Sequence, residues 1–258
     1  MIISHFPSGG GDPSGMPQFT YTGTYQVDYD SGGWKVKFVT SGRLSMISGA
    51  TVDIFMVGGG GSGSDYNVTT TGQTTGGSTV RQYTSKRYGG GGGSGYAVTH
   101  RQVELVAGQS YDIAVGEAGE ATTFNGVNIT LAYTANPGQN GGQYTGGDGG
   151  SGGASGGYYS TYTSGGYFSG EKYVAGGKDG SDGSKTMSSI SEYAVGHGQG
   201  SPTREFGDAD GALYAQGGRA TYDASYQQEP VPNSGNGGTG GQYRAGSSGV
   251  VIIRNTRG

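Results

Sequence analysis

Apolar residues in this chain fall in short islands in which apolar and polar positions alternate. A period of two residues is typical of half-buried β-strands, whose successive side chains point to opposite faces. Over residues 51–57 both faces of the alternation carry bulky side chains, which predicts a central strand. Residues 250–253 form the most apolar tetrapeptide and predict a closing strand buried in a sheet.

The islands predict about ten short strands joined by turns. Residues 30–33 suit a hairpin turn between the first two strands, residues 43–47 and 51–57 form another predicted pair, and Asn125-Gly126 is the strongest hairpin signal. No segment keeps the i, i+3, i+4 apolar spacing of a helix, so we expect essentially no α-helix. The strands are predicted at residues 19–25, 34–39, 43–47, 51–57, 96–100, 103–106, 111–115, 121–124, 127–133 and 250–253.

Glycine changes this picture, because 60 of the 258 residues are glycine, against a usual content of ~7%. Residues 96–135 hold only 4 glycines, whereas residues 58–95 hold 14 and residues 136–249 hold 32. The glycine is therefore inserted between strands. We expect an all-β fold in which a β-sandwich or jelly-roll-like module, residues 19–135 with 249–254, carries glycine-rich insertions at 58–95 and 136–248.

The insertions have two interpretations. Flexible Gly/Ser linkers would have this composition, but a linker that leaves and rejoins one sheet connects nothing. The alternative is a bundle of polyglycine II helices, extended and left-handed with about three residues per turn. Chains without side chains can approach closely enough to exchange backbone hydrogen bonds laterally, so no apolar core is needed. Runs such as residues 141–153 have the glycine-doublet texture that this packing requires.

Four segments together resemble the glycine-rich domain of phage and prophage tail proteins: residues 55–61 (Phe-Met-Val-Gly-Gly-Gly-Gly), 111–116 (Tyr-Asp-Ile-Ala-Val-Gly), 203–207 (Thr-Arg-Glu-Phe-Gly) and 249–254 (Gly-Val-Val-Ile-Ile-Arg). The likeness covers roughly residues 40–258. The architecture is also similar to the tail-fibre tip adhesins of T-even-like phages and to the glycine-rich extracellular domain of anaplastic lymphoma kinase. The resemblance implies a β-module joined to a polyglycine lattice, and a structural role for Arg204, Glu205 and Phe206 as a buried ion pair or loop anchor. The N-terminus does not resemble that of the T-even adhesins.

Charge and cysteine content exclude several classes. The formal net charge is −4 without a basic run, which argues against nucleic acid as a partner. There is no cysteine for disulfides or thiolate metal sites. The sequence has no Gly-X-Y period, which excludes collagen. Neither a stretch of 18 apolar residues nor a signal-peptide pattern is present, so we expect no membrane insertion.

Catalytic and cofactor motifs are weak. The pattern Gly58-x-Gly60-x-x-Gly63 matches a dinucleotide fingerprint, but no helix or βαβ unit can follow it. The Asp-Gly-Ser-Asp-Gly run at 179–183 lacks the ligand spacing of an EF-hand and is interpreted as a solvated turn. The three histidines lie in unrelated contexts, and no two of the glutamates are placed together by any motif. We therefore expect a protein that is not an enzyme and has no cofactor or metal.

Tyrosine is the informative residue, with 20 copies against one Trp and seven Phe. Tyrosine beside Ser, Gly and Thr is the composition of antibody-like binding loops, where the ring supplies contact area at low entropic cost. The alternative is that these rings merely seal the edges of the lattice. The candidate receptor-binding residues are Tyr66, Tyr83, Tyr88, Tyr158, Tyr159, Tyr162, Tyr167, Phe168, Tyr222 and Tyr226.

The sequence thus predicts a phage tail or tail-fibre tip adhesin, which is part of the virion and acts extracellularly at the surface of the bacterial host. Its distal Tyr-rich loops would touch a surface protein or glycan, and residues 1–18 would dock onto the rest of the tail or fibre. The alternatives are a structural virion component without specific receptor binding and a glycan-binding lectin module.

Overall fold

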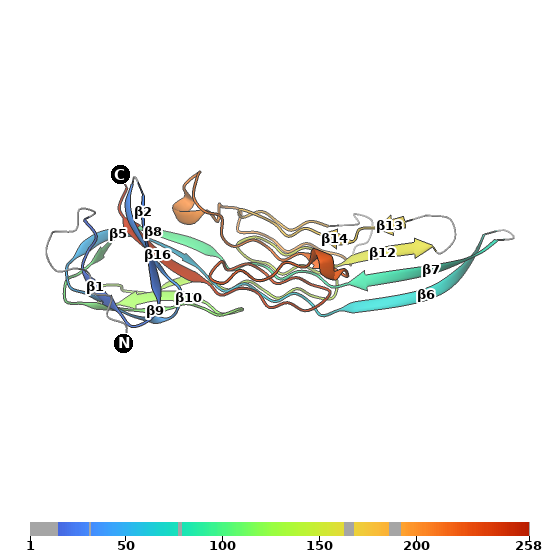
Figure 1. Ribbon diagram of the computed structural model, residues 1–258, viewed down its shortest axis with the longest axis horizontal. Helices are drawn as coiled ribbons and strands as arrows, with labels where there is room; N and C mark the ends of the chain where they lie inside the picture. Colours follow the sequence, from blue (N-terminus) through green and yellow to red (C-terminus); the bar gives the residue numbers. More distant parts are fainter. Residues whose placement is uncertain (1–14, 31, 77–78, 163–167, 186–191, 258) are drawn as a thin grey trace.

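The molecule is elongated, with two sheets at one end, a third at the other, and long extended segments between them (Figure 1). The computed structural model describes residues 15–30, 32–76, 79–162, 168–185 and 192–257. Its strands form antiparallel sheets. Within the described residues the helices are two 3₁₀ turns, η1 (Glu205–Gly207) and η2 (Ala224–Tyr226). The predicted all-β class without α-helix is confirmed for this part of the chain.

The first five-stranded sheet has the order β1-β4-β9-β10-β11. Buried and exposed side chains alternate along β9, where Tyr111 and Ile113 are buried and Asp112 faces solvent. This is the period-two pattern that predicted the strand. The strands are β1 (Phe19–Tyr21), β4 (Gly42–Met46), β9 (Ser110–Ala114), β10 (Thr122–Gly126) and β11 (Tyr133–Ala135).

The second five-stranded sheet has the order β2-β3-β16-β5-β8. The closing strand β16 is hydrogen-bonded to β3 on one side and β5 on the other, so the predictions of a buried closing strand and a central β5 are confirmed. The strands are β2 (Tyr25–Asp30), β3 (Gly33–Phe38), β5 (Ala50–Val57), β8 (Ala97–Leu105) and β16 (Val250–Asn255).

Both sheets contribute to one apolar core, in which Leu44, Tyr111 and Phe124 of the first meet Ile54 and Ile253 of the second. The other face of the second sheet is also covered, because a smaller cluster joins side chains of β5 and β16 to η1 and the segment after it. Because both faces of β5 and β16 are buried, the sequences of these two strands are continuous apolar runs.

Two predicted strand assignments were wrong about pairing. The strand predicted at 19–25 is two strands in different sheets, β1 and β2, because the chain changes sheets at residues 22–24. Gly23 lies there so close to Ser41 that a Cβ would come 2.6 Å from the Ser41 carbonyl oxygen. Residues 43–47 and 51–57 likewise belong to different sheets: β4 pairs with β1 and β9, whereas β5 pairs with β16 and β8.

Two further predictions failed for local reasons. The strands predicted at 96–100 and 103–106 are one strand, β8, in which Arg101 and Gln102 bulge opposite Asp53. Gln102 has φ +55°, and the Asp53 carboxylate accepts its backbone N–H at 3.2 Å. Asn125-Gly126 is not a hairpin turn but the end of β10. Gly126 is needed there because the Tyr111 ring lies against it, 2.3 Å from where a Cβ would be.

Between the two ends, glycine-rich segments run side by side without strand or helix assignment (Figure 1). We call them the glycine segments: residues 58–65, 89–95, 138–156, 175–184, 194–200, 215–219 and 234–249. They exchange backbone hydrogen bonds with different neighbours in turn. Gly92 donates to Gly238 at 2.9 Å and accepts from Gly218 at 2.8 Å, while Gly61 donates to Gly93 at 2.8 Å.

These segments are buried without apolar side chains. Residues 151–157 are all buried, although Ala154 is the only one with an apolar side chain. Space excludes larger residues, since a Cβ on Gly153 would lie 2.1 Å from the carbonyl oxygen of Gly91. Backbone hydrogen bonding and close packing therefore replace the hydrophobic core in this region.

The third sheet, which we call the distal sheet, has the order β13-β12-β7-β6. It projects from the glycine segments at the end opposite to β1 and β16 (Figure 1). The excursion within residues 58–95 is thus a long hairpin, which was not predicted from the sequence. Its strands are β6 (Asn67–Gly76), β7 (Thr79–Tyr88), β12 (Gly157–Tyr162) and β13 (Phe168–Gly170), and a pair β14 (Tyr173–Val174) and β15 (Ala220–Thr221) is hydrogen-bonded nearer the glycine segments.

Most of the expected N-terminal docking segment, residues 1–18, lies outside the described residues. Of its described part, Met16 is buried in the apolar core and contacts the hydroxyl of Tyr29 through its sulfur at 3.9 Å. This part of the segment therefore packs at the end of the molecule that holds β1 and β16.

Candidate functional site

Tyrosines predicted to lie on loops lie instead on strands of the distal sheet. Tyr83 is on β7, and Tyr158, Tyr159 and Tyr162 are on β12. The register pairs Tyr158 with Arg87 and Tyr162 with Tyr83, so these four side chains share one face. Tyr159 pairs with Lys86 and shares the opposite face. Strands hold these rings in fixed relative positions that a loop would not give them.

About midway along the hairpin, where Tyr83 pairs with Gly72, Tyr83 and Tyr162 form an aromatic pair with ring centroids 6.2 Å apart. Both rings are half-buried. Gly72 lies opposite Tyr83 in the register, and the Tyr83 ring covers it, with the hydroxyl 2.6 Å from where a Cβ would be. A side chain at this position would have to displace the Tyr83 ring, so the glycine lets the ring lie flat across β6.

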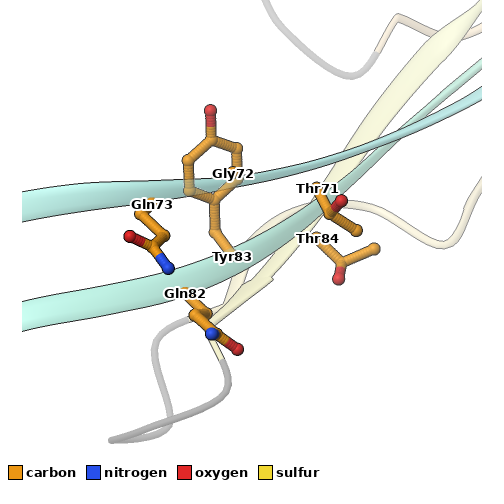
Figure 2. Close-up of a pocket in the computed structure, with 6 residues that line it drawn as sticks. All are labelled: Thr71, Gly72, Gln73, Gln82, Tyr83 and Thr84. Atoms are coloured by element: carbon orange, nitrogen blue, oxygen red, sulfur yellow. The ribbon is translucent and has the colours of Figure 1, made fainter.

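The same hairpin carries a polar pocket lined by Thr71, Gly72, Gln73, Gln82, Tyr83 and Thr84. Figure 2 shows the Tyr83 ring on one side of the two strands and the four Thr and Gln side chains on the other. Those four residues form two cross-strand pairs, Thr71 with Thr84 and Gln73 with Gln82. Hydroxyl and amide groups donate and accept hydrogen bonds, so this surface offers a polar, uncharged ladder.

A second tyrosine cluster lies where the distal sheet meets the glycine segments. The rings of Tyr66 and Tyr144 are 5.6 Å apart, and those of Tyr144 and Tyr193 are 5.1 Å apart, both in T-shaped contact. The Tyr66 and Tyr144 hydroxyls are 3.5 Å apart, and the hydrogen bond from Tyr144 lowers the pKa of Tyr66. Arg87 lies beside these hydroxyls, so the cluster presents a cation among phenols.

A third cluster lies on the opposite face, around Tyr222. The ring of Tyr222 stacks on Tyr159 at 5.1 Å, and Lys86 Nζ lies 4.5 Å from the Tyr222 centroid, in cation–π range. Tyr88 lies beneath, with its ring 5.8 Å from that of Tyr222. Burial raises the pKa of both Tyr88 and Tyr222 above the ordinary value of tyrosine.

Tyr88 is a correction to the candidate set. Its side chain is fully buried, and its hydroxyl donates to the carbonyl of Glu171 at 2.7 Å. Gly157 leaves room for its ring, which lies 2.2 Å from where a Cβ of that glycine would be. Tyr88 therefore anchors the base of the distal sheet and has no surface to offer a receptor.

The remaining candidates divide as follows. Tyr226, on η2, stacks on Tyr173 with ring centroids 4.9 Å apart, and Arg219 lies 6.0 Å from the Tyr173 ring. Tyr167 lies outside the described residues, and for Phe168 the structure describes only the backbone, in β13.

Sequence reasoning missed the partners that complete these clusters: Tyr144, Tyr173 and Tyr193, with Lys86 and Arg87. The available signal was the Thr-rich run that precedes Tyr83, because β-branched residues favour strands. A predicted hairpin there would have placed Lys86 and Arg87 on opposite faces. Tyr144 and Tyr193 carry no such signal, since they lie in segments whose neighbours are set by long-range packing.

The Arg204-Glu205-Phe206 element joins the glycine segments to the second sheet. Arg204 is paired with Asp179 at 2.8 Å, and the buried Glu205 with Lys35 of β3 at 2.8 Å. Phe206 is buried at φ +56°.

Around Phe206 lies a network of charged groups. Its ring packs 5.7 Å from that of Phe55, and the Arg254 guanidinium lies 3.9 Å from its centroid. Arg254 and Arg101 both contact the buried carboxylate of Asp53, at 3.4 and 3.1 Å, and Arg254 is also paired with Asp208. This network clamps η1 onto β5 and β16.

Among the residues that the structure describes, no three His, Cys, Asp or Glu side chains form a group that could hold a metal ion. The two carboxylates of the 179–183 turn already have partners: Asp179 accepts from Thr203 and Arg204, and Asp182 accepts the backbone N–H of Gly198 at 2.8 Å. No described helix has the length and apolarity needed to cross a membrane.

No model of a known protein family matches this chain, and neither a curated protein nor a solved structure is found to be similar to it.

Proposed function

We propose that this protein is a receptor-binding protein, or adhesin, at the tip of a phage tail or tail fibre. One observation carries the proposal: the tyrosine-bearing distal sheet projects at the end of an elongated molecule opposite to the sheets that hold β1 and β16 (Figure 1). A binding protein that is attached at one end needs its recognition surface at the other. The attachment would involve residues 1–18, docked onto the tail or fibre.

On this proposal the two five-stranded sheets form a β-sandwich base, and the glycine segments are polyglycine II helices. Lateral backbone hydrogen bonds, such as Gly153 to Gly147 at 2.8 Å and Gly196 to Gly153 at 3.0 Å, support this interpretation over a flexible linker. A hydrogen-bonded bundle keeps the distal sheet at a fixed distance and orientation. Binding would then cost little ordering entropy.

The chemistry of the distal sheet supports recognition rather than catalysis. Tyr83, Tyr158 and Tyr162 share one face with Arg87, and tyrosine with arginine is the side-chain pair enriched where binding energy concentrates. No cofactor, nucleic acid or membrane enters the proposal. The receptor would be a protein or glycan of the bacterial surface, reached by the virion from outside the cell.

The test is binding of the fluorescently labelled protein to a panel of intact bacterial strains, with protease-treated and periodate-treated cells alongside. Strain-selective binding supports an adhesin, and the treatment that abolishes it identifies the receptor class. The double variant Tyr83→Ser, Tyr162→Ser should weaken binding about tenfold or more while the protein stays folded. Tyr29→Ser is the matched control, because Tyr29 is 54% exposed but lies on β2, at the other end.

A structural virion component is the second candidate, favoured by the tyrosines that pack on one another, as Tyr159 and Tyr222 do. It predicts no strain-selective binding and no effect of the double variant. A lectin module predicts binding that periodate abolishes and protease does not.

A further inference from the structure

Strand β6 leaves one edge of the distal sheet open. The sheet ends at β6, and nine of its ten residues are exposed, the tenth being half-buried Gly72. Gly89 donates to the carbonyl of Tyr66 at 2.8 Å, and β6 continues from there in the antiparallel register that pairs Asn67 with Tyr88. Hydrogen-bonded pairs alternate along such a ladder, so the odd-numbered residues of β6 direct N–H and C=O away from β7.

Exposed strand edges invite pairing with another chain, and proteins usually blunt them with short length, charges, proline or bulges. Among the described strands the other edges follow this rule. The edge strands β1, β11 and β13 have three residues each. Strand β2 carries the charged residue Asp28, and β8 carries the bulge at Arg101 and Gln102. Strand β6 has ten residues and no charge, proline or bulge.

The charge of the distal sheet indicates what would pair there. Its four strands carry three cationic residues, Arg81, Lys86 and Arg87, all on β7 next to the open edge, and no acidic residue. The whole chain has a formal net charge of −4. Lys86 lies near the carboxylate of Asp223, which offsets its charge, so Arg81 and Arg87 give the sheet its positive character. A locally positive sheet in an acidic protein favours an acidic partner.

We propose that the outer edge of β6 is a docking site for an extended, acidic polypeptide segment, which adds to the distal sheet as a fifth strand. Main-chain hydrogen bonds to residues such as Thr69, Thr71 and Gln73 provide affinity, as in other cases of strand addition. The cations of β7 select the charge of the added strand. This inference rests on the proposed function and narrows it: the receptor contact is a protein strand rather than a glycan.

The deciding variant is Thr71→Pro, measured on a strain that the wild-type protein binds. Proline at this outward-directed position removes one N–H and places a ring at the edge, while the hydrogen bonds to β7 remain. We expect cell binding to fall about tenfold or more. The matched control Thr71→Ala keeps the N–H and should bind within about twofold of wild type. Thermal unfolding of both variants reports whether the hairpin is intact.

A charge variant keeps the proposal testable if Thr71→Pro does not fold. Arg81→Gln should weaken binding about threefold at low salt and less at high salt, because exposed ion pairs contribute little and are screened. Its control is Lys178→Gln, an exposed cation of the glycine segments. Equal effects of Arg81→Gln and Lys178→Gln, or full binding by a folded Thr71→Pro, would overturn the proposal while leaving the adhesin function standing.

A peptide-binding assay without cells distinguishes the edge-site proposal from the adhesin proposal. A labelled eight-residue peptide that alternates Asp with Thr or Val should bind the full-length protein more tightly than the same peptide with Lys in place of Asp, and Thr71→Pro should abolish the difference. If no strain is bound yet the peptide behaves this way, the adhesin proposal fails and the edge site stands. A peptide that shows no preference for Asp over Lys counts against the edge site. If periodate treatment of the cells abolishes binding and protease treatment does not, the receptor is a glycan and the edge-site proposal is overturned. If the protein forms a dimer that Thr71→Pro dissociates, the strand that pairs with β6 belongs to a second copy, which also overturns it.

Discussion

Replacing Gly153 with alanine tests whether the glycine segments are packed too closely to admit even a methyl group. The new Cβ would lie 2.1 Å from the carbonyl oxygen of Gly91 and 2.8 Å from the carbonyl carbon of Gly92, whereas ordinary contact begins near 3.4 Å. The neighbouring chain would have to move by about 1 Å. Both contacts are backbone atoms, so no side chain can turn away to make room.

The cost follows from the hydrogen bonds that such a movement breaks. Gly153 donates to Gly147 at 2.8 Å and accepts from Gly196 at 3.0 Å. Each buried backbone group left without a partner costs about 1–3 kcal/mol, and the reduced freedom of the unfolded alanine chain returns about 0.4–1 kcal/mol. We expect a net destabilisation of about 3 kcal/mol, which lowers the midpoint of thermal unfolding by about 6–12 °C.

Differential scanning calorimetry measures this shift, and Gly76→Ala is the matched control. A Cβ on Gly76 meets no atom within 4 Å, so its midpoint should stay within about 2 °C of wild type. A Gly153→Ala protein that unfolds at the wild-type temperature would show that these segments tolerate side chains. That result would refute the close packing of the glycine segments and, with it, the polyglycine II interpretation.

Three further predictions concern the clamp on η1. Asp53→Asn leaves Arg254 buried without its full countercharge and should lower the free energy of unfolding by about 3 kcal/mol in chemical denaturation; an unchanged midpoint would show that the pair is dispensable. Phe206→Ala should cost about 3 kcal/mol, with a calorimetric midpoint well below wild type, because the ring is fully buried. The hydrogen bond from Arg254 lowers the pKa of Asp208 in the folded protein below its usual 3.8. The stabilisation that this carboxylate contributes is therefore fully present above pH 3.8, and it is lost as the pH falls through the lowered pKa of the folded protein. Wild type should therefore lose stability more steeply than Asp208→Asn between about pH 4 and 2, and parallel curves would exclude a role for this carboxylate.

Much of the base of the molecule followed from pattern alone. The alternation in residues 51–57 and the apolar run at 250–253 predicted two central strands, and both are central because their residues are covered on each face. The pairing of the strands could not be predicted from this pattern. Residues 43–47 and 51–57 are neighbours in sequence yet belong to different sheets, and Asn125-Gly126 extends a strand because Gly126 accommodates the Tyr111 ring. Local sequence signals indicate that a strand or turn is favourable, but they do not indicate which other segment of the chain lies beside it.

The candidate site shows the same division. Composition identified tyrosine as the residue to follow, but the fold buried Tyr88 completely and left Tyr83 of the same strand half-buried. It also brought Tyr144 and Tyr193 to Tyr66 from segments far apart in the chain.

The all-β class, the strand islands of the base and the position of the glycine insertions followed from local sequence, since each depends on the properties of neighbouring residues. Long-range packing set which strands pair, made the excursion in residues 58–95 a hairpin with an open edge, and selected which tyrosines are accessible. The glycine segments explain this difference. A chain without side chains carries no pattern of faces, so its partners are selected by backbone hydrogen bonds and close contact between residues far apart in sequence, as between Gly92, Gly218 and Gly238.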